Sequence, residues 1–138
     1  MNLSFEAIRS AEDITLINSG GIAEQVVGQQ LRTLFPLFMN PELYYWTRHS
    51  PDSDAEVDYV IQLGSDIVPL EVKAGEAGAL KSLHIFMNLK KLPLAGRIYS
   101  GVPLNTKVSV KLHDGTQVSY ELRSLPFYLM SEVHRLLT

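Results

Sequence analysis

The chain has 138 residues, no cysteine and a formal net charge of −3 at pH 7. Its length suits one domain, and its 46% hydrophobic and 20% charged content is typical of globular proteins. Without cysteine, disulfides, thiolate metal sites and cysteine nucleophiles are excluded, which fits a cytoplasmic location. The acidic balance argues against a general nucleic-acid coat, because such coats depend on lysine and arginine. No apolar stretch approaches the ~18 residues of a membrane span, so we expect no membrane association.

The N-terminal part begins without a clear pattern and then predicts a helix. Residues 1–18 are mixed in character, and we expect a short helix and a loop there. From Gly20 onward apolar residues recur every three or four positions, which predicts an amphipathic helix. Ser19 or Gly20 can cap the helix, and Pro36 falls where it should end. An aromatic-rich strand is predicted over residues 43–48.

The middle of the chain predicts a hairpin followed by a helix and a strand. Apolar and polar residues alternate over residues 56–62, which is the period of a β-strand. A turn at residues 64–66 leads to a strand over residues 67–73, and we expect the two strands to pair in antiparallel fashion. A second helix is predicted over residues 80–91 and a short strand over residues 96–100.

The C-terminal part predicts a second hairpin and a closing helix. Residues 107–113 and 116–123 flank Asp114-Gly115, a pair typical of type I′ turns. Pro126 suits the first turn of a helix that continues to about residue 137. The resulting order is helix, three strands, helix, strand, hairpin and helix. This order predicts an α/β or α+β fold with a mixed central sheet flanked by helices.

Charged residues on the two central strands carry the strongest chemical prediction. Residues two apart on a strand share a face, so Glu71 and Lys73 should project together. If the hairpin register brings Asp58 beside them, two carboxylates and one ammonium meet at a polar point between apolar walls. Glu24, at the border of the apolar stripe of the first helix, can add a third carboxylate. Such groups suit hydrated Mg²⁺ or Mn²⁺ and the hydrolysis of a phosphodiester, with Lys73 orienting water or stabilising developing charge.

The order of these residues resembles a known family. The segments that carry the resemblance are Gly20…Glu24…Val27…Leu31, Tyr45-Trp46…Arg48, Glu56-Val57-Asp58-Tyr59, Pro69-Leu70-Glu71-Val72-Lys73, Ser82-Leu83…Phe86 and Leu125-Pro126-Phe127-Tyr128-Leu129. An acidic residue on a first helix, an aspartate and E-x-K on adjacent strands resemble the PD-(D/E)XK nuclease superfamily. More narrowly, residues 20–137 resemble the nuclease-like domain found C-terminal to P-loop (AAA-type) ATPase domains in bacterial and archaeal proteins.

The resemblance implies a fold, a site and a substrate. The implied fold is a restriction-endonuclease-like αβββαβ core, to which this chain adds a C-terminal β-hairpin and helix. The implied metal site consists of Glu24, Asp58 and Glu71, and Lys73 is the implied catalytic lysine. The implied cofactor is Mg²⁺ or Mn²⁺, and the implied substrate is DNA.

The chain also departs from the family pattern. Gln25 stands where asparagine is expected, and the loop before Glu56 is longer and richer in aspartate. No G-x-x-x-x-G-K-[ST] phosphate loop occurs in the sequence. Residues 78–82 are superficially similar to it but have the wrong glycine spacing. We therefore expect residues 1–138 to be a single nuclease-like domain from the C-terminal part of a longer ATPase, rather than a protein that stands alone.

Two functions from different classes follow. The first is a Mg²⁺-dependent nuclease-like domain of a prokaryotic ATPase that hydrolyses phosphodiester bonds in DNA. The second is a catalytically inactive module that binds nucleic acid or protein, or regulates an attached ATPase; the acidic net charge favours it, and fold alone does not decide. On this second interpretation Glu71 and Lys73 are a solvent-facing pair, Asp58 is a surface strand residue and Glu24 is a helix-surface glutamate. The oligomeric state stays open.

Histidines and aromatic residues offer weaker candidates. His49, His84, His113 and His134 show no ligand spacing, and we interpret them as structural or surface residues. The aromatic run at residues 44–46 can stack on bases, but alternating aromatics on a strand more often belong to the core and the sheet surface. We adopt that second interpretation.

Overall fold

The computed structural model describes residues 19–138. The helix and loop expected over residues 1–18 lie outside this range. In chain order the elements are helix α2 (Ser19–Thr33), strands β1 (Tyr44–Arg48), β2 (Ala55–Leu63) and β3 (Asp66–Val72), helix α3 (Lys81–Lys90), strands β4 (Leu94–Tyr99), β5 (Leu104–Lys111) and β6 (Gln117–Pro126), the 3-10 helix η2 (Phe127–Glu132) and helix α4 (Val133–Leu136).

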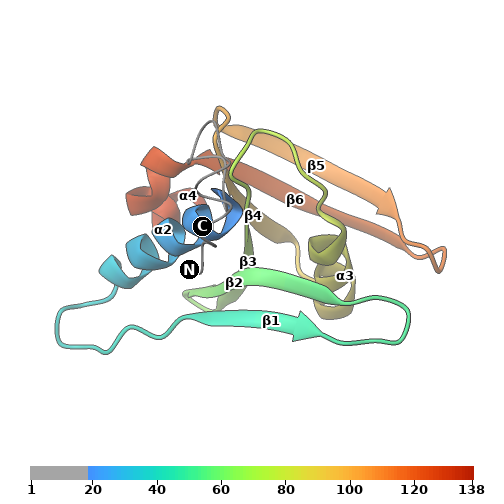
Figure 1. Cartoon of the computed structure of the whole chain (residues 1–138), viewed down its shortest axis with the longest axis horizontal. Coiled ribbons are helices and arrows are strands. Elements are labelled where there is room, and N and C mark those ends of the chain that lie inside the picture. Colours follow the sequence, from blue (N-terminus) through green and yellow to red (C-terminus); the bar gives the residue numbers. More distant parts are fainter. Residues whose placement is uncertain (1–18) are drawn as a thin grey trace, which may run out of the picture.

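One mixed sheet organises the part of the chain that the structure describes. Its six strands lie in the order β1-β2-β3-β4-β6-β5. The pairs β1–β2, β2–β3 and β5–β6 are antiparallel, whereas β3–β4 and β4–β6 are parallel. Helix α2 covers one face together with η2 and α4, and α3 covers the other (Figure 1). The expected mixed sheet flanked by helices, with a C-terminal hairpin and helix, is therefore confirmed.

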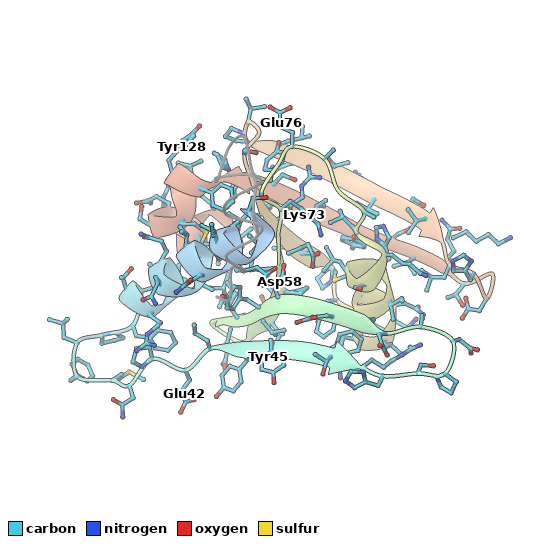
Figure 2. All side chains as sticks on the ribbon, in the orientation of Figure 1. Glu42, Tyr45, Asp58, Lys73, Glu76 and Tyr128 are labelled. Carbon is cyan, nitrogen blue, oxygen red and sulfur yellow. The ribbon has the colours of Figure 1, made fainter. Side chains whose placement is uncertain are left out.

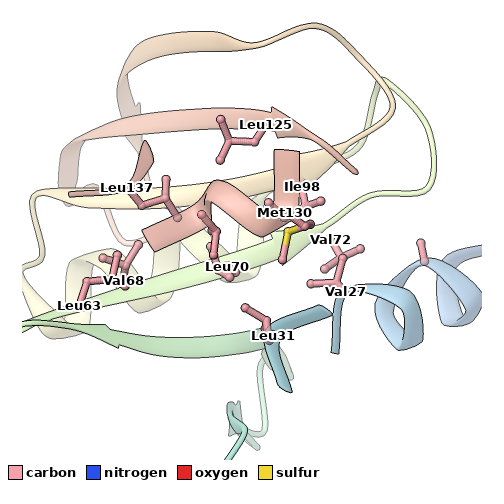
Figure 3. Close-up of a cluster of buried hydrophobic side chains, with 12 residues drawn as sticks. Val27, Leu31, Leu63, Val68, Leu70, Val72, Ile98, Leu125, Met130 and Leu137 are labelled. Atoms are coloured by element: carbon pink, nitrogen blue, oxygen red, sulfur yellow. The ribbon is translucent and has the colours of Figure 1, made fainter. Parts of the chain in front are cut away.

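The core on the α2 side fixes the position of the central hairpin. Val27 and Leu31 of α2 pack in one cluster with Leu70 and Val72 of β3, and Met130 of η2 completes it (Figure 3). Val27 and Leu70 are fully buried, at 0% exposure. Each fully buried side chain of this size contributes about 1.5–3 kcal/mol. Because Leu70 and Val72 point toward α2, the residue between them points toward the opposite face.

Strands β2 and β3 form the predicted antiparallel hairpin. Leu63 pairs with Asp66 across the turn. Gly64 has a φ of 63° at the first turn position, where type II′ hairpin turns place glycine. The ladder ends at the pair Tyr59–Leu70, so main-chain groups beyond that pair need other partners.

A β-bulge interrupts β2 at Asp58. The register with β1 shifts there, so that Asp58 and Tyr59 together lie opposite Tyr45. As a result Val57 packs in the cluster on the α3 side, whereas Tyr59 packs against the cluster on the α2 side. Bulges re-aim side chains and are common beside functional sites. Here the bulge places Asp58 at the point where the hairpin opens.

The turn of the C-terminal hairpin differs from the prediction. A type I′ turn needs positive φ at both central residues; Gly115 has a φ of 87°, but Asp114 does not have a positive φ. Gly115 N–H donates to Leu112 O at 3.0 Å and Leu112 N–H donates to Thr116 O at 2.9 Å, which leaves a loop of residues 113–115. Asp114 Oδ1 accepts the Thr116 N–H at 2.9 Å. The type I′ prediction is therefore wrong, because the aspartate stabilises the turn through its side chain.

The closing helix also differs from the prediction. Pro126 has extended backbone, with φ −67° and ψ 155°, and it pairs with Tyr99 as the last residue of β6. The next six residues form the 3-10 helix η2, and the α-helix α4 has four residues. Parallel pairing with β4 therefore overrides the preference of proline for a first helical turn.

Candidate functional site

The predicted site residues come from three elements and lie near one another. Asp58 sits at the bulge of β2, Glu71 lies near the end of β3, and Lys73 follows that strand directly. Figure 2 shows Asp58 and Lys73 between α2 and α3 in this view. Glu24 belongs to α2. The hairpin and the helix packed on it thus bring together residues that are far apart in the sequence.

Asp58 closes the open end of the hairpin. Beyond the last ladder pair, the Val72 N–H donates to Asp58 Oδ2 at 2.7 Å. The carboxylate therefore takes the place of a main-chain acceptor, and its Oδ1 remains for another ligand. Burial raises the pKa of Asp58 above its usual value, although the Val72 N–H and the charge of Lys73 act in the opposite direction.

Glu71 is a buried carboxylate with one satisfied oxygen. It is 7% exposed, so the interpretation of Glu71 as a solvent-facing residue is wrong. Its Oε1 accepts a hydrogen bond from Lys73 Nζ at 2.6 Å, which confirms that these two side chains project together. Its Oε2 is enclosed and has no hydrogen-bond partner among the described residues. Burial raises the pKa of Glu71 to about 7; the bond from Lys73 lowers it, and the charge of Asp58 raises it.

Glu24 is exposed on α2 and acts on this group through its charge, which raises the pKa of Glu71. Burial raises the pKa of Glu24 itself, and so does repulsion from Asp58 and Glu56. A hollow of about 260 Å³ is lined by Glu24, Glu56, Asp58 and Tyr59, and Glu71 is not part of its lining. The Tyr59 hydroxyl donates to the main-chain oxygen of Glu24 at 2.8 Å, which ties α2 to β2. Sequence reasoning missed this role of Tyr59, because nothing distinguishes it from the other aromatic strand residues.

The donor set fits a hydrated divalent ion with few protein ligands. Among residues 19–138, no group of three or more histidine, cysteine, aspartate or glutamate side chains is arranged to hold a metal ion. Asp58 and Glu71 still provide two carboxylates, and Mg²⁺ commonly uses one or two while keeping several waters. The enclosed Oε2 of Glu71 is a carboxyl oxygen without a partner among the described residues, which is costly in a buried position. An ion at this position would satisfy it.

The aromatic run divides between core and surface, and of its three residues only Trp46 packs against a buried cluster. Trp46 packs edge-on against Phe86, with ring centroids 5.1 Å apart. Tyr44 and Tyr45 are 59% and 70% exposed. A larger cavity of about 880 Å³ lies along β1, but its lining is mainly apolar and includes none of the four predicted site residues. The acidic hollow contains two of the four, Glu24 and Asp58, whereas Glu71 and Lys73 are not among its lining residues.

The fold and the site define a class of protein, and comparison with known proteins supplies the family. The class is a mixed α+β domain with a carboxylate and lysine group at the open end of its central hairpin. Residues 19–121 match the family model described as Domain of unknown function (DUF4143). The chain belongs to this family, an uncharacterised domain typically found with ATPases. No curated protein matches the chain.

The lengths and hydropathy of the helices can be compared with those of a membrane-spanning helix. Over residues 19–138, no helix combines the length and the apolar character needed to cross a membrane.

Proposed function

We propose that this chain is a nuclease-like domain of a prokaryotic ATPase, and that it hydrolyses phosphodiester bonds of DNA with Mg²⁺ or Mn²⁺. The observation that carries the proposal is the environment of Glu71: its Oε1 accepts from Lys73, the charge of Asp58 acts on its pKa, and its enclosed Oε2 has no partner among the described residues. The resemblance to PD-(D/E)XK nucleases and the usual association of the family with ATPases support it.

Each residue has a separate role in this proposal. Asp58 and Glu71 would hold the ion, and Glu24 would add negative charge from the α2 side. A divalent ion bound there supplies Lewis-acid polarisation of the phosphodiester. Lys73, whose ammonium lies 2.6 Å from Glu71 Oε1, would turn to the attacking water to orient it and would offset charge that develops on the phosphate.

The loop after β3 confines the stem of Lys73. A Cβ atom at Gly78 would lie 2.8 Å from Lys73 Cδ and 3.1 Å from Lys73 Cε. The glycine therefore lets the main chain pass against the lysine stem, and the loop restricts the paths that the ammonium can take. A preorganised ammonium loses less entropy when it meets a phosphate.

Cleavage assays test the proposal directly. We expect the protein, intact and with any attached ATPase part, to cut plasmid or branched DNA when Mn²⁺ or Mg²⁺ is added. Lys73→Ala should lower the rate by about 100-fold or more, because it removes a charge used in the transition state. Lys111→Ala is the matched control, since Lys111 is exposed at the far end of β5. Undetectable cleavage with both metals and every DNA form, or an unchanged rate in Lys73→Ala, would contradict the proposal.

An inactive binding or regulatory module is the second candidate. It is favoured by the lack of a three-acid metal group among residues 19–138. Calorimetric titration with Mn²⁺ separates the candidates. The nuclease proposal expects binding in the millimolar range or tighter that is lost in Asp58→Asn, a variant that keeps an acceptor for the Val72 N–H. Undetectable binding by the wild type favours the inactive module.

A further inference from the structure

Arg97 of β4 lies beside the acidic group on the same face of the sheet. In the parallel β3–β4 pair, Glu71 is directly opposite Arg97, and adjacent strands are about 4.8 Å apart. The ion pairs within residues 19–138 do not include Arg97. Burial raises the pKa of Tyr120, and the charges of Glu71 and Arg97 both act on it, in opposite directions. Arg97 and Glu71 therefore flank one common region.

Two contacts hold the guanidinium of Arg97 in place. Its Nε donates to Ser124 Oγ at 3.0 Å, and Ser124 is itself fully buried in β6. Its Cζ lies 4.3 Å from the ring centroid of Tyr99, which is a cation–π distance. Neither terminal nitrogen donates to a described residue, and neither is enclosed without a partner. Both terminal nitrogens therefore keep their donors unused by residues 19–138.

Arg123 differs from Arg97 in how its guanidinium is used. Arg123 is also half-buried, but it pairs with Glu121 at 2.8 Å and donates to the main-chain oxygens of Leu136 and Thr138, at 2.9 Å each. Arg123 thus stabilises the C-terminal end of the chain. Arg97 has no such set of acceptors in the described range. A held guanidinium with two available nitrogens matches a tetrahedral oxyanion, which it can bind in bidentate fashion.

We propose that Arg97 binds a backbone phosphate of a nucleic acid, adjacent to the phosphate that lies at Asp58 and Glu71. This inference rests on the proposed function, in that a nucleic acid must occupy this face. Lys73 and Arg97 are then two cations next to Glu71, one bonded to its side chain and one opposite it on β4. They offset the repulsion that two carboxylates and a net charge of −3 exert on a polyanion.

The salt dependence of DNA binding tests this assignment. Anisotropy of a fluorescein-labelled DNA strand is measured with the intact protein over a series of salt concentrations, with Ca²⁺ in place of Mg²⁺ and also in EDTA. Arg97→Gln should raise Kd by roughly 5- to 10-fold and lower the salt slope by about 1. Arg97→Lys should fall between the wild type and Arg97→Gln, because it keeps the charge and loses the planar fork. Arg32→Gln is the control; it removes the same charge from an exposed position on α2 and should change neither quantity.

The outcomes separate this inference from the proposed hydrolysis. If Arg97→Gln binds DNA more weakly but the wild type cleaves no DNA, the hydrolytic proposal is contradicted and the phosphate contact is supported. If the salt dependence of DNA binding is the same in Arg97→Gln as in the wild type, the phosphate contact is contradicted. It is also contradicted if the wild-type protein binds a polyglutamate peptide but no DNA. A structural role for Arg97 predicts a lower Tm with an unchanged salt slope, so thermal unfolding of the same variants completes the test.

Discussion

Glu71 sits in surroundings that favour its protonated form. The side chain is buried beside Asp58, and one of its oxygens has no partner in the described range. Burial raises its pKa to about 7, which makes protonation easier. The same feature that would hold a divalent ion therefore makes the folded chain sensitive to pH.

The pH dependence of unfolding follows from this shift. The folded chain binds a proton at Glu71 up to about pH 7, whereas the unfolded chain loses it near the ordinary glutamate pKa of 4.5. The contribution of Glu71 to stability is therefore complete below about pH 4.5 and is lost as the pH rises through about 7. We expect the free energy of unfolding to fall by roughly 1–3 kcal/mol over this window.

Urea unfolding of Glu71→Gln at several pH values checks this expectation. The neutral amide removes the titration, so the variant should lose most of the decrease in stability seen for the wild type. Asp58 and Glu24 also have raised pKa values, and a smaller decrease of the same sign should remain. A decrease as large as that of the wild type would show that another group carries the effect.

At the scale of elements, the contact between α2 and β2 positions Glu24 and depends on a glycine. A Cβ atom at Gly28 would lie 2.5 Å from the Tyr59 hydroxyl oxygen. That hydroxyl holds the main chain of Glu24. The absence of a side chain at Gly28 therefore sets the distance between the helix and the strand that carries Asp58.

Two glycine substitutions on the same helix test this contact. Gly28→Ala should lower the free energy of unfolding by about 1–3 kcal/mol, because the tyrosine must move and lose its bond to Glu24. Gly20→Ala is the matched control; a Cβ there meets nothing within 4 Å, and alanine favours helix by up to ~1 kcal/mol. Chemical unfolding of both variants measures the difference. Equal stabilities for the two variants would contradict the account of the contact.

Local patterns predicted most of the elements, because their causes are local. The alternation along residues 56–62 and the glycine turn at Gly64 were enough to predict the β2–β3 hairpin. The bulge at Asp58 was not predictable, because it appears as a register shift against β1 and leaves the alternation of residue types unchanged. The predicted type of the turn at Asp114 was wrong, because the Asp-Gly dipeptide suits two turn types. The longer loop is set by the pairing between β5 and β6.

At the scale of the whole molecule, long-range pairing decides which residues reach the site. Asp58, Glu71 and Lys73 were predicted because they lie on a hairpin, where sequence distance is short. Arg97 was missed because β4 reaches β3 through the crossover of α3, and a parallel register cannot be read from the pattern of either strand. The sheet order in Figure 1 shows that β3 and β4 lie at the centre, so the second cation comes from the adjoining strand.

Manganese soaked into a crystal of the protein gives the most direct test of the central claim. Anomalous scattering should show one peak between the Asp58 and Glu71 carboxylates, with Lys73 turned away from Glu71 or bound to a neighbouring water. The peak should be lost in Asp58→Asn crystals treated in the same way. An ordered site with Lys73 still bound to Glu71 and no manganese peak between the two carboxylates would contradict the claim that this group holds a metal ion.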